Sequence, residues 1–343
     1  MLNLFHIQKV SEEDLNRMVK KGHLSRMDAH ISRLPTEYIE FFLHIRSSYS
    51  DKTLNSVYYK LVLLEQIAGK TLKNLTSVEF DNLILQLESR YTKNSIGIYI
   101  AAMRLFFKFM LKRGYMTKNP IDEDFKFKSD YERVPFFLRP DVIKKIFELL
   151  DKRVEQAEDC FKADGSQISK DILVRMNMIR LAARLLADTG SRISEIKKIT
   201  SKHIVQRDDG RAICRIYNSK VKNGGDRTRK VLLSENTVNA LQSYLKLAPA
   251  AIQSGDAPLI AVTIRQIQYW ISDIRDELFK KGFLEVKKLS PHDFRRFYGT
   301  QMIANGVDHF TVSKLMGQNS PASLRPYIDI SEETVVKCYD MMK

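Results

Sequence analysis

Residues 289–330 read LSPHDFRRFYGTQMIANGVDHFTVSKLMGQNSPASLRPYIDI. They begin with a predicted helix that carries a histidine and an arginine. Ser290 can cap this helix, and Pro291 suits its first position. His292 and Arg295 are three residues apart, so they share one helix face. Arginine binds phosphate oxygens through a bidentate fork, and histidine exchanges a proton near neutral pH. The stretch therefore indicates a site that handles phosphate.

The same stretch continues with a second helix and a loop that carries a tyrosine. Asn305 and Gly306 are expected to end the first helix. Asp308 can cap the second helix, which is expected to stop near Gly317. Tyr327 follows on a polar, proline-containing loop. A deprotonated tyrosine can act as a nucleophile, so Tyr327 is a candidate for covalent chemistry.

This spacing resembles the tyrosine recombinase (phage integrase) family and its Xer-like members. The C-terminal signature of that family is His-x-x-Arg, then Leu-Gly-His or Gly-Trp, then a tyrosine nine residues later. Here His292 and Arg295 are followed by LMGQ at residues 315–318, and Tyr327 lies nine residues after Gln318. The sequence departs from the pattern at Gln318, whose amide can donate a hydrogen bond to phosphate but carries no charge.

A second motif, TGSRISE at residues 189–195, forms a predicted helix–helix corner. Gly190 permits a tight turn, Ser191 can cap a new helix, and Glu195 suits its first turn. Arg192 is then expected at a helix N-terminus, where backbone N–H groups favour an anion. The motif also matches the family's first-arginine box, Thr-Gly-x-Arg-x-Ser-Glu, and this resemblance implies that Arg192 is catalytic.

Two alternating, β-rich segments, residues 211–218 and 227–234, flank the turn sequence NGGD and predict a β-hairpin. The family carries a catalytic lysine on such a hairpin. Lys220 fits that position best. Lys222 remains the competitor, because alternating residues of a strand share one face.

Composition supports a partner of opposite charge. The 343 residues include 56 Lys and Arg against 41 Asp and Glu, a net charge of +15, which favours nucleic acid. The sequence has no run of 18 apolar residues, so no membrane span is predicted. The first residues do not resemble a secretory signal. Three cysteines are widely spaced, without metal-ligand spacing, and indicate reduced thiols in a cytosolic protein: Cys160, Cys214 and Cys338. The predicted location is the cytoplasm, in association with DNA.

The predicted fold is mainly α with a small antiparallel β-sheet. Four amphipathic helices with short connections predict a helical bundle, which resembles the family's core-binding domain. A charged stretch with few aliphatic residues follows and reads as a linker. The predicted parts are an N-terminal extension (1–34), a core-binding domain (35–122), a linker (123–133) and a catalytic domain ending in a helix (134–343).

The resemblance implies a site-specific recombinase that cleaves and rejoins DNA through a 3′-phosphotyrosine on Tyr327, without metal or ATP. Arg192 and Arg295 would bind the nonbridging oxygens, His292 would be the base, and Lys220 would be the acid. The implied partner is double-stranded DNA with an inverted-repeat site, bound by a homotetramer on two sites.

Several alternatives remain open at this point. A type IB topoisomerase uses similar chemistry, and a catalytically impaired DNA-binding protein of the same fold is favoured only by Gln318. Tyr298 is an alternative nucleophile, although its place in the helix suggests a core residue. Residues 331–343 predict an amphipathic helix that docks either on a neighbouring subunit or on its own domain. Residues 1–34 could be an arm that touches DNA or a partner, or a solvated lead-in.

Overall fold

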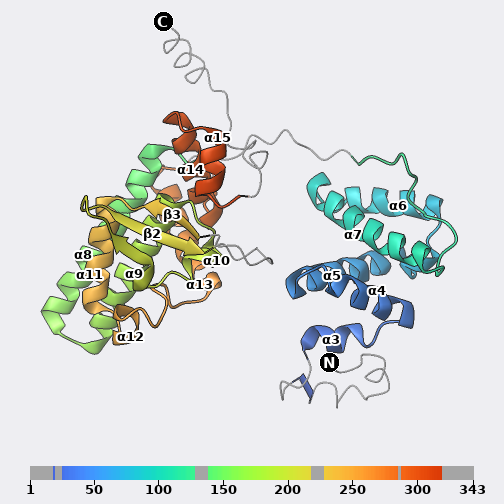
Figure 1. The fold of residues 1–343 in the computed structure, drawn as a ribbon, viewed down its shortest axis with the longest axis horizontal. Coiled ribbons are helices and arrows are strands. Elements are labelled where there is room, and N and C mark those ends of the chain that lie inside the picture. The colour runs from blue at the N-terminus through green and yellow to red at the C-terminus, as the bar shows by residue number, and fades with distance from the viewer. Residues whose placement is uncertain (1–17, 20–24, 128–137, 218–227, 285–286, 319–343) are drawn as a thin grey trace, which may run out of the picture. The chain divides into compact units, whose positions relative to one another are not determined.

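The computed structural model describes residues 18–19, 25–127, 138–217, 228–284 and 287–318. The chain divides into two compact units, residues 1–133 and 134–343, whose elements are drawn in Figure 1. Each unit has its own hydrophobic core. The described residues are mainly helical with one small antiparallel sheet, which confirms the predicted fold class. The exact borders of the predicted domains stay a prediction.

The first unit is a bundle of helices. It contains α3 (Arg26–Ile31), α4 (Thr36–Arg46), α5 (Asp51–Ala68), α6 (Ser77–Glu88) and α7 (Lys93–Lys112). The helices begin at local caps; the Ser50 hydroxyl, for example, accepts from the Thr53 N–H. Helix α3 falls in the predicted N-terminal extension, yet its Met27 and Ile31 are buried in the core of this unit. Residues 26–31 are therefore part of the bundle rather than a solvated lead-in.

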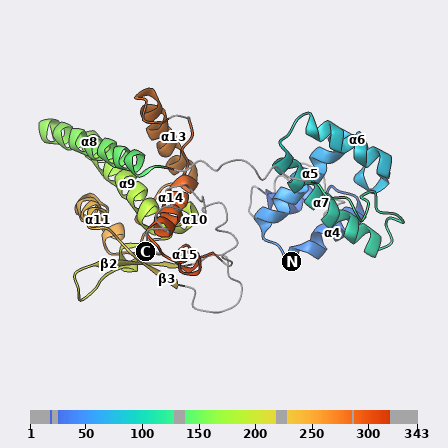
Figure 2. The same cartoon turned by 90° about the horizontal axis from the view of Figure 1, so that it is seen from above.

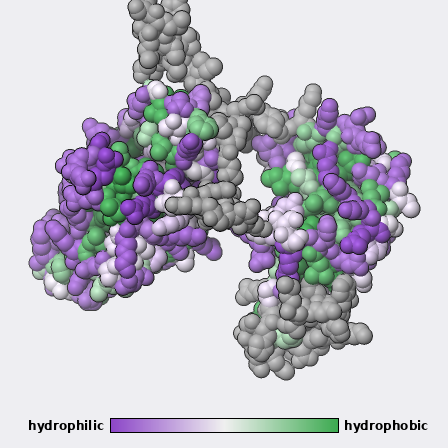
Figure 3. Space-filling model, viewed as in Figure 1, coloured by the Kyte–Doolittle hydropathy of each residue, from purple (hydrophilic) through white to green (hydrophobic). Residues whose placement is uncertain are grey.

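Helix α7 is the most apolar element of the first unit. Among the described helices it alone is long and apolar enough, by length and composition, to cross a membrane. Its Met103, Phe106 and Phe107 are fully buried against the other helices. Hydrophilic side chains cover much of the surface of both units in the view of Figure 3. The apolar character of α7 is thus explained by its place in the core.

The second unit is larger and mixed. Its helices are α8 (Pro140–Asp164), α9 (Gln167–Thr189), α10 (Ile193–Ile196), α11 (Glu235–Leu247), α12 (Ala250–Gln253), α13 (Ile264–Lys280), α14 (Pro291–Ala304) and α15 (His309–Leu315). Its strands are β1 (Ile204–Gln206), β2 (Ala212–Tyr217) and β3 (Thr228–Leu232).

Helix α9 lies at the centre of this unit and packs against α8, α11, α14 and β3 (Figure 2). Gly165 ends α8 in a left-handed conformation, and the Ser166 hydroxyl caps α9 by accepting from the Ser169 N–H. At its other end α9 stops at Thr189, and Gly190 turns the chain with a φ of 55°. The predicted corner at residues 189–195 therefore follows directly from the end of the central helix.

The sheet has the antiparallel order β1-β2-β3, which confirms the predicted hairpin as β2 and β3. Cys214 pairs with Val231, and Ile216 pairs with Arg229. Alternation turns these four residues toward the core. The sequence did not predict β1, which has only three residues. The hairpin tip with Lys220 and Lys222 lies outside the described residues.

Candidate active site

Arg295 is fixed deep in the second unit. The local start of α14 agrees with the prediction: the Asp293 carboxylate accepts from the N–H and the hydroxyl of Ser290 at 2.8 and 2.7 Å. The Arg295 side chain is only 2% exposed. Its Nη1 donates to the carbonyl oxygen of Gly190 at 2.6 Å. The second-arginine motif is thereby bonded to the corner that carries the first.

Gly190 permits this approach for two reasons. Its φ of 55° is a left-handed conformation that costs a residue with a Cβ about 1–2 kcal/mol. A Cβ on Gly190 would also lie 2.4 Å from Cδ1 of Tyr298, whose ring packs against it. The backbone of the corner at Gly190 therefore lies directly against side chains of α14, with no space for a further side chain between them.

Arg192 leaves the same corner as the N-cap residue of α10. Its Nη1 donates to Glu195 Oε1 at 3.0 Å and to the carbonyl oxygen of Gly317 at 3.4 Å. The side chain is 31% exposed, so part of the guanidinium remains open to solvent. Arg192 is thus oriented on one side and accessible on the other, as a phosphate ligand must be.

Two details of this corner differ from the sequence prediction. Ser191 does not cap α10; it is buried, and its hydroxyl accepts from Arg229. The Arg192 N–H does not face an anion from outside, because Glu195 Oε2 accepts from it at 3.0 Å. The reason is a tertiary contact: the buried Arg229 of β3 donates to the Ser191 hydroxyl. That hydroxyl is therefore not used to cap α10, and the N-cap position is Arg192.

Arg229 is a residue that the sequence analysis missed. It is 9% exposed, and its Nη2 donates to Glu195 Oε2 at 2.7 Å and to the Ser191 hydroxyl at 2.8 Å. Alternation in β3 places Arg229 on the same face as Val231 and therefore toward the core. That inward register is the sequence signal that could have revealed it.

His292 lies in the first turn of α14 and is exposed. Partial burial lowers the pKa of its imidazole, and the charges of Arg296, Arg295 and Arg192 lower it further. Both predicted arginines are thus among the charges that lower the pKa of His292. A lowered pKa keeps His292 neutral at pH 7, which is the form a general base requires.

Gln318 ends the described part of the site. The Asp308 carboxylate caps α15 as predicted, by accepting from the N–H groups of Phe310 and Thr311. Gly317 follows α15 with a φ of 63°, and the Gln318 N–H donates to the Ser313 carbonyl at 2.9 Å. Through Gly317, whose carbonyl accepts from Arg192, the turn before Gln318 is attached to the same cluster.

The two candidate tyrosines differ in what the structure describes. Tyr298 is buried in the core, and burial raises the pKa of its phenol to about 12, which disfavours the phenolate a nucleophile needs. Tyr327 lies outside the described residues, as do Lys220 and Lys222. The structure thus joins Arg295 to the corner of Arg192 and Arg192 to the turn before Gln318, with His292 on the same helix as Arg295.

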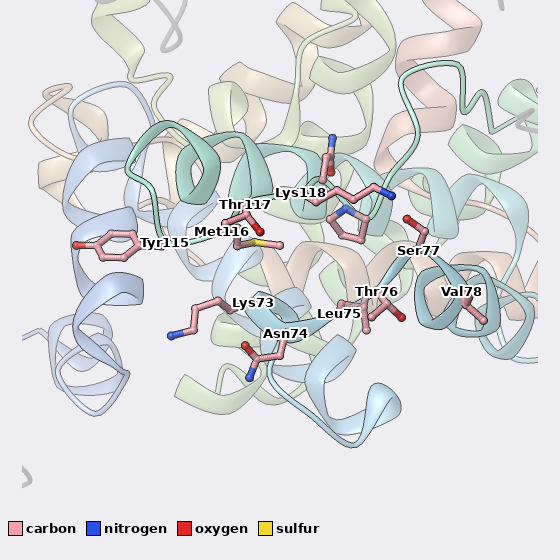
Figure 4. A pocket seen from close by; sticks show the side chains of 12 residues that line it. Lys73, Asn74, Leu75, Thr76, Ser77, Val78, Tyr115, Met116, Thr117 and Lys118 are labelled. Atoms are coloured by element: carbon pink, nitrogen blue, oxygen red, sulfur yellow. The ribbon is translucent and has the colours of Figure 1, made fainter.

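The described chain also has pockets away from this cluster. A pocket of about 580 Å³ lies in the first unit and is lined by residues 73–78 and 115–120 (Figure 4). Lys73 in its wall is paired with Glu37 at 2.5 Å. Within the described ranges, no three His, Cys, Asp or Glu side chains gather as a metal site would require.

The model of the phage integrase family matches residues 138–334, which is more than half of the chain. The chain belongs to the phage integrase family. Among curated proteins of this family, it is 24% identical over 311 residues to the tyrosine recombinase XerC of Anoxybacillus flavithermus, covering 86% of this chain and 92% of that protein. It is 25% identical over 314 residues to XerD of Brucella melitensis, covering 87% and 94%.

Solved structures of integrases share the fold. A lambda integrase dimer bound to a COC′ core site aligns with a TM-score of 0.60 and 14% identity, covering 94% of this chain and 82% of that one. XerH bound to palindromic difH substrate in a post-cleavage complex aligns with a TM-score of 0.59 and 15% identity, covering 99% and 95%. At such low identity the likeness shows the mainly helical fold with its small sheet.

Proposed function

We propose that this chain is a site-specific DNA recombinase that cleaves and rejoins DNA through a covalent 3′-phosphotyrosine on Tyr327. One observation supports it above all: Arg295, which shares a helix with His292, donates to the carbonyl oxygen of Gly190, two residues before Arg192 in the other, distant motif. The relatives named recombinases, and the integrase structures solved with DNA, support the same substrate.

The proposed chemistry is a transesterification at phosphorus. The Tyr327 phenol gives its proton to His292 and attacks the phosphorus, while the bond from phosphorus to the 5′ oxygen breaks. Lys220, or in the alternative register Lys222, gives a proton to the leaving 5′ oxygen. A phosphotyrosine and a free 5′-hydroxyl result, and attack by a 5′-hydroxyl reverses the step and rejoins DNA.

Fixed positive charge is what the described residues contribute to this step. Arg192 and Arg295 would each donate to nonbridging phosphate oxygens, and a preorganised donor of this kind is worth about 3–4 kcal/mol in a transition state. Gln318 would add a neutral hydrogen bond where relatives with histidine have a charge. We propose that these groups suffice without a metal ion or ATP.

The assembly follows from the number of cleavages. Exchange of two duplexes requires four strand cleavages, and one chain supplies one Tyr327, so we propose a tetramer on two inverted-repeat sites. The first unit would act as a core-binding domain that helps the second to grip the duplex. The net charge of +15 suits this role, and the place of action would be DNA in the cytoplasm.

The test is a covalent adduct on a nicked suicide substrate, built on an inverted-repeat duplex selected from random-sequence DNA by binding to the protein. Tyr327→Phe should abolish the adduct and leave affinity for intact DNA nearly unchanged, since only a hydroxyl is lost. Tyr298→Phe is the matched control and should retain the adduct. An adduct that survives Tyr327→Phe would show that the nucleophile is another residue.

The same substrates separate the alternatives. A recombinase joins strands between two duplexes, whereas a type IB topoisomerase relaxes supercoiled plasmid without exchanging partners. A binding protein that has lost cleavage would retain the selected duplex in a gel shift and form no adduct.

A further inference from the structure

Arg229 is a charged residue in a position where strands carry apolar side chains. It faces inward from β3, next to Val231 along the strand and opposite Ile216. Only 8% of its side chain is exposed. Burying a guanidinium is costly unless it is paired, so its partners indicate why it is there.

Glu195 is the main partner, and it lies between two arginines. Its Oε2 accepts from Arg229 Nη2 at 2.7 Å and from the Arg192 N–H at 3.0 Å, while its Oε1 accepts from Arg192 Nη1 at 3.0 Å. The carboxylate side chain itself is fully buried. One carboxylate therefore couples the buried arginine to the arginine that reaches the surface.

Arg229 also supports the turn before Gln318. A Cβ on Gly317 would lie 2.7 Å from Arg229 Nη1, so the guanidinium lies directly against this glycine. The Gly317 carbonyl in turn accepts from Arg192 Nη1. Three elements of the site, α10, β3 and the end of α15, thus meet on the Arg229 side chain.

We infer that Arg229 is a positioning residue, which orients Arg192 through Glu195 and holds the Gly317 turn, within the recombinase site proposed above. It is too buried to touch DNA and acts through its neighbours. Its charge balances that of Glu195, so the charge of Arg192 is left for the phosphate.

This arrangement predicts a change in pH dependence when Arg229 is replaced. Burial raises the pKa of Glu195, but the hydrogen bond and charge of Arg229, together with Arg192, bring it below its ordinary value. Among the described residues, the charged groups that face Glu195 are these two arginines. Tyr298 from α14 and Cys214 from β2 lie near Arg229 itself. Without Arg229, Glu195 should take up a proton at a higher pH and release Arg192.

The experiment measures single-turnover cleavage of the selected nicked duplex, at saturating protein, across pH. Arg229→Met should slow cleavage near pH 7 on the order of 10²-fold, as expected when a catalytic group moves by about 1 Å. The rate should recover as pH rises, because Glu195 then ionises again. Adding Glu195→Gln to Arg229→Met should remove that extra pH dependence. Arg215→Met, an exposed arginine on the adjacent strand, is the matched control and should cleave as the wild type does.

Two further results keep the inference testable. Arg229→Lys retains the charge but loses the fork, so it should cleave more slowly than the wild type with the wild-type pH profile. A folded Arg229→Met or Arg229→Lys protein with wild-type rate and profile would overturn the positioning role. Failure of the wild type to form any adduct would instead overturn the proposed function, so the two failures are distinguishable.

Discussion

Replacing Gly190 by alanine should damage both stability and cleavage, and the chain contains a matched control. Gly190 and Gly165 end the neighbouring helices α9 and α8 with nearly the same φ, 55° and 58°. Alanine costs about 1–2 kcal/mol in this conformation, partly offset by up to about 1 kcal/mol from a stiffer unfolded chain. Both variants should share this modest loss of unfolding free energy.

The two glycines differ in what surrounds them. A Cβ at Gly165 meets nothing within 4 Å, whereas at Gly190 it lies 2.4 Å from Cδ1 of the buried Tyr298 ring. Overpacking of this kind costs about 1–3 kcal/mol. We therefore expect Gly190→Ala to lose that much more unfolding free energy than Gly165→Ala. Movement of the Gly190 carbonyl should also misplace Arg295 and slow cleavage by roughly 10²-fold.

Urea unfolding followed by tryptophan fluorescence measures this difference. Trp270 is the only tryptophan of the chain and packs against the core of the second unit, so its signal reports on the unit that carries the corner. Adduct formation on the nicked duplex measures the second effect. Equal losses of free energy in the two alanine variants would refute the packing argument.

Three other results are expected of the site. Arg192→Ala or Arg295→Ala should reduce cleavage by orders of magnitude yet weaken binding of intact DNA only modestly, because many other phosphate contacts remain; near-normal adduct yield would contradict the clamp. Lys220→Ala should slow cleavage of ordinary DNA and be rescued by a 5′-bridging phosphorothiolate, whose thiolate leaves without a proton; if only Lys222→Ala behaves so, the acid is Lys222. Cleavage should rise with pH, with a midpoint below the ordinary histidine pKa of about 6.5, because a base acts only when deprotonated and the pKa of His292 is lowered; a limb unchanged in His292→Gln would exclude this role.

Sequence reasoning succeeded where the determining interactions are local. The start of α14 at Ser290 and the cap of α15 at Asp308 depend on side chains within three residues of the backbone groups they bind. Such caps are encoded in short windows of sequence. The motifs that carry His292 and Arg295 could therefore be placed on a helix from the amino-acid sequence alone.

Sequence reasoning failed where a residue far away in the chain determines the local structure. The hydrogen bond from Arg229 to the Ser191 hydroxyl joins positions 38 residues apart, and the N-cap position of α10 falls on Arg192 instead of the predicted Ser191. From sequence alone, an arginine in a hairpin is normally interpreted as solvent-exposed. Only the alternation of the strand, which puts Arg229 on the same face as the buried Val231, indicates that it points inward. Strand β1 was missed because three residues are too few to show alternation.

The cluster around Glu195 also explains how the proposed phosphate site can contain a buried carboxylate. An unbalanced carboxylate beside Arg192 would neutralise the arginine and repel the phosphate. Arg229 supplies the second positive charge, so the three side chains keep a net charge of +1 while Glu195 holds Arg192 by two hydrogen bonds. A neutral hydrogen-bond acceptor could orient Arg192 without a buried pair, but more weakly, because hydrogen bonds to charged groups are about twice as strong. In the proposed site, the buried Arg229 therefore allows Arg192 to be held rigidly and still attract a DNA phosphate.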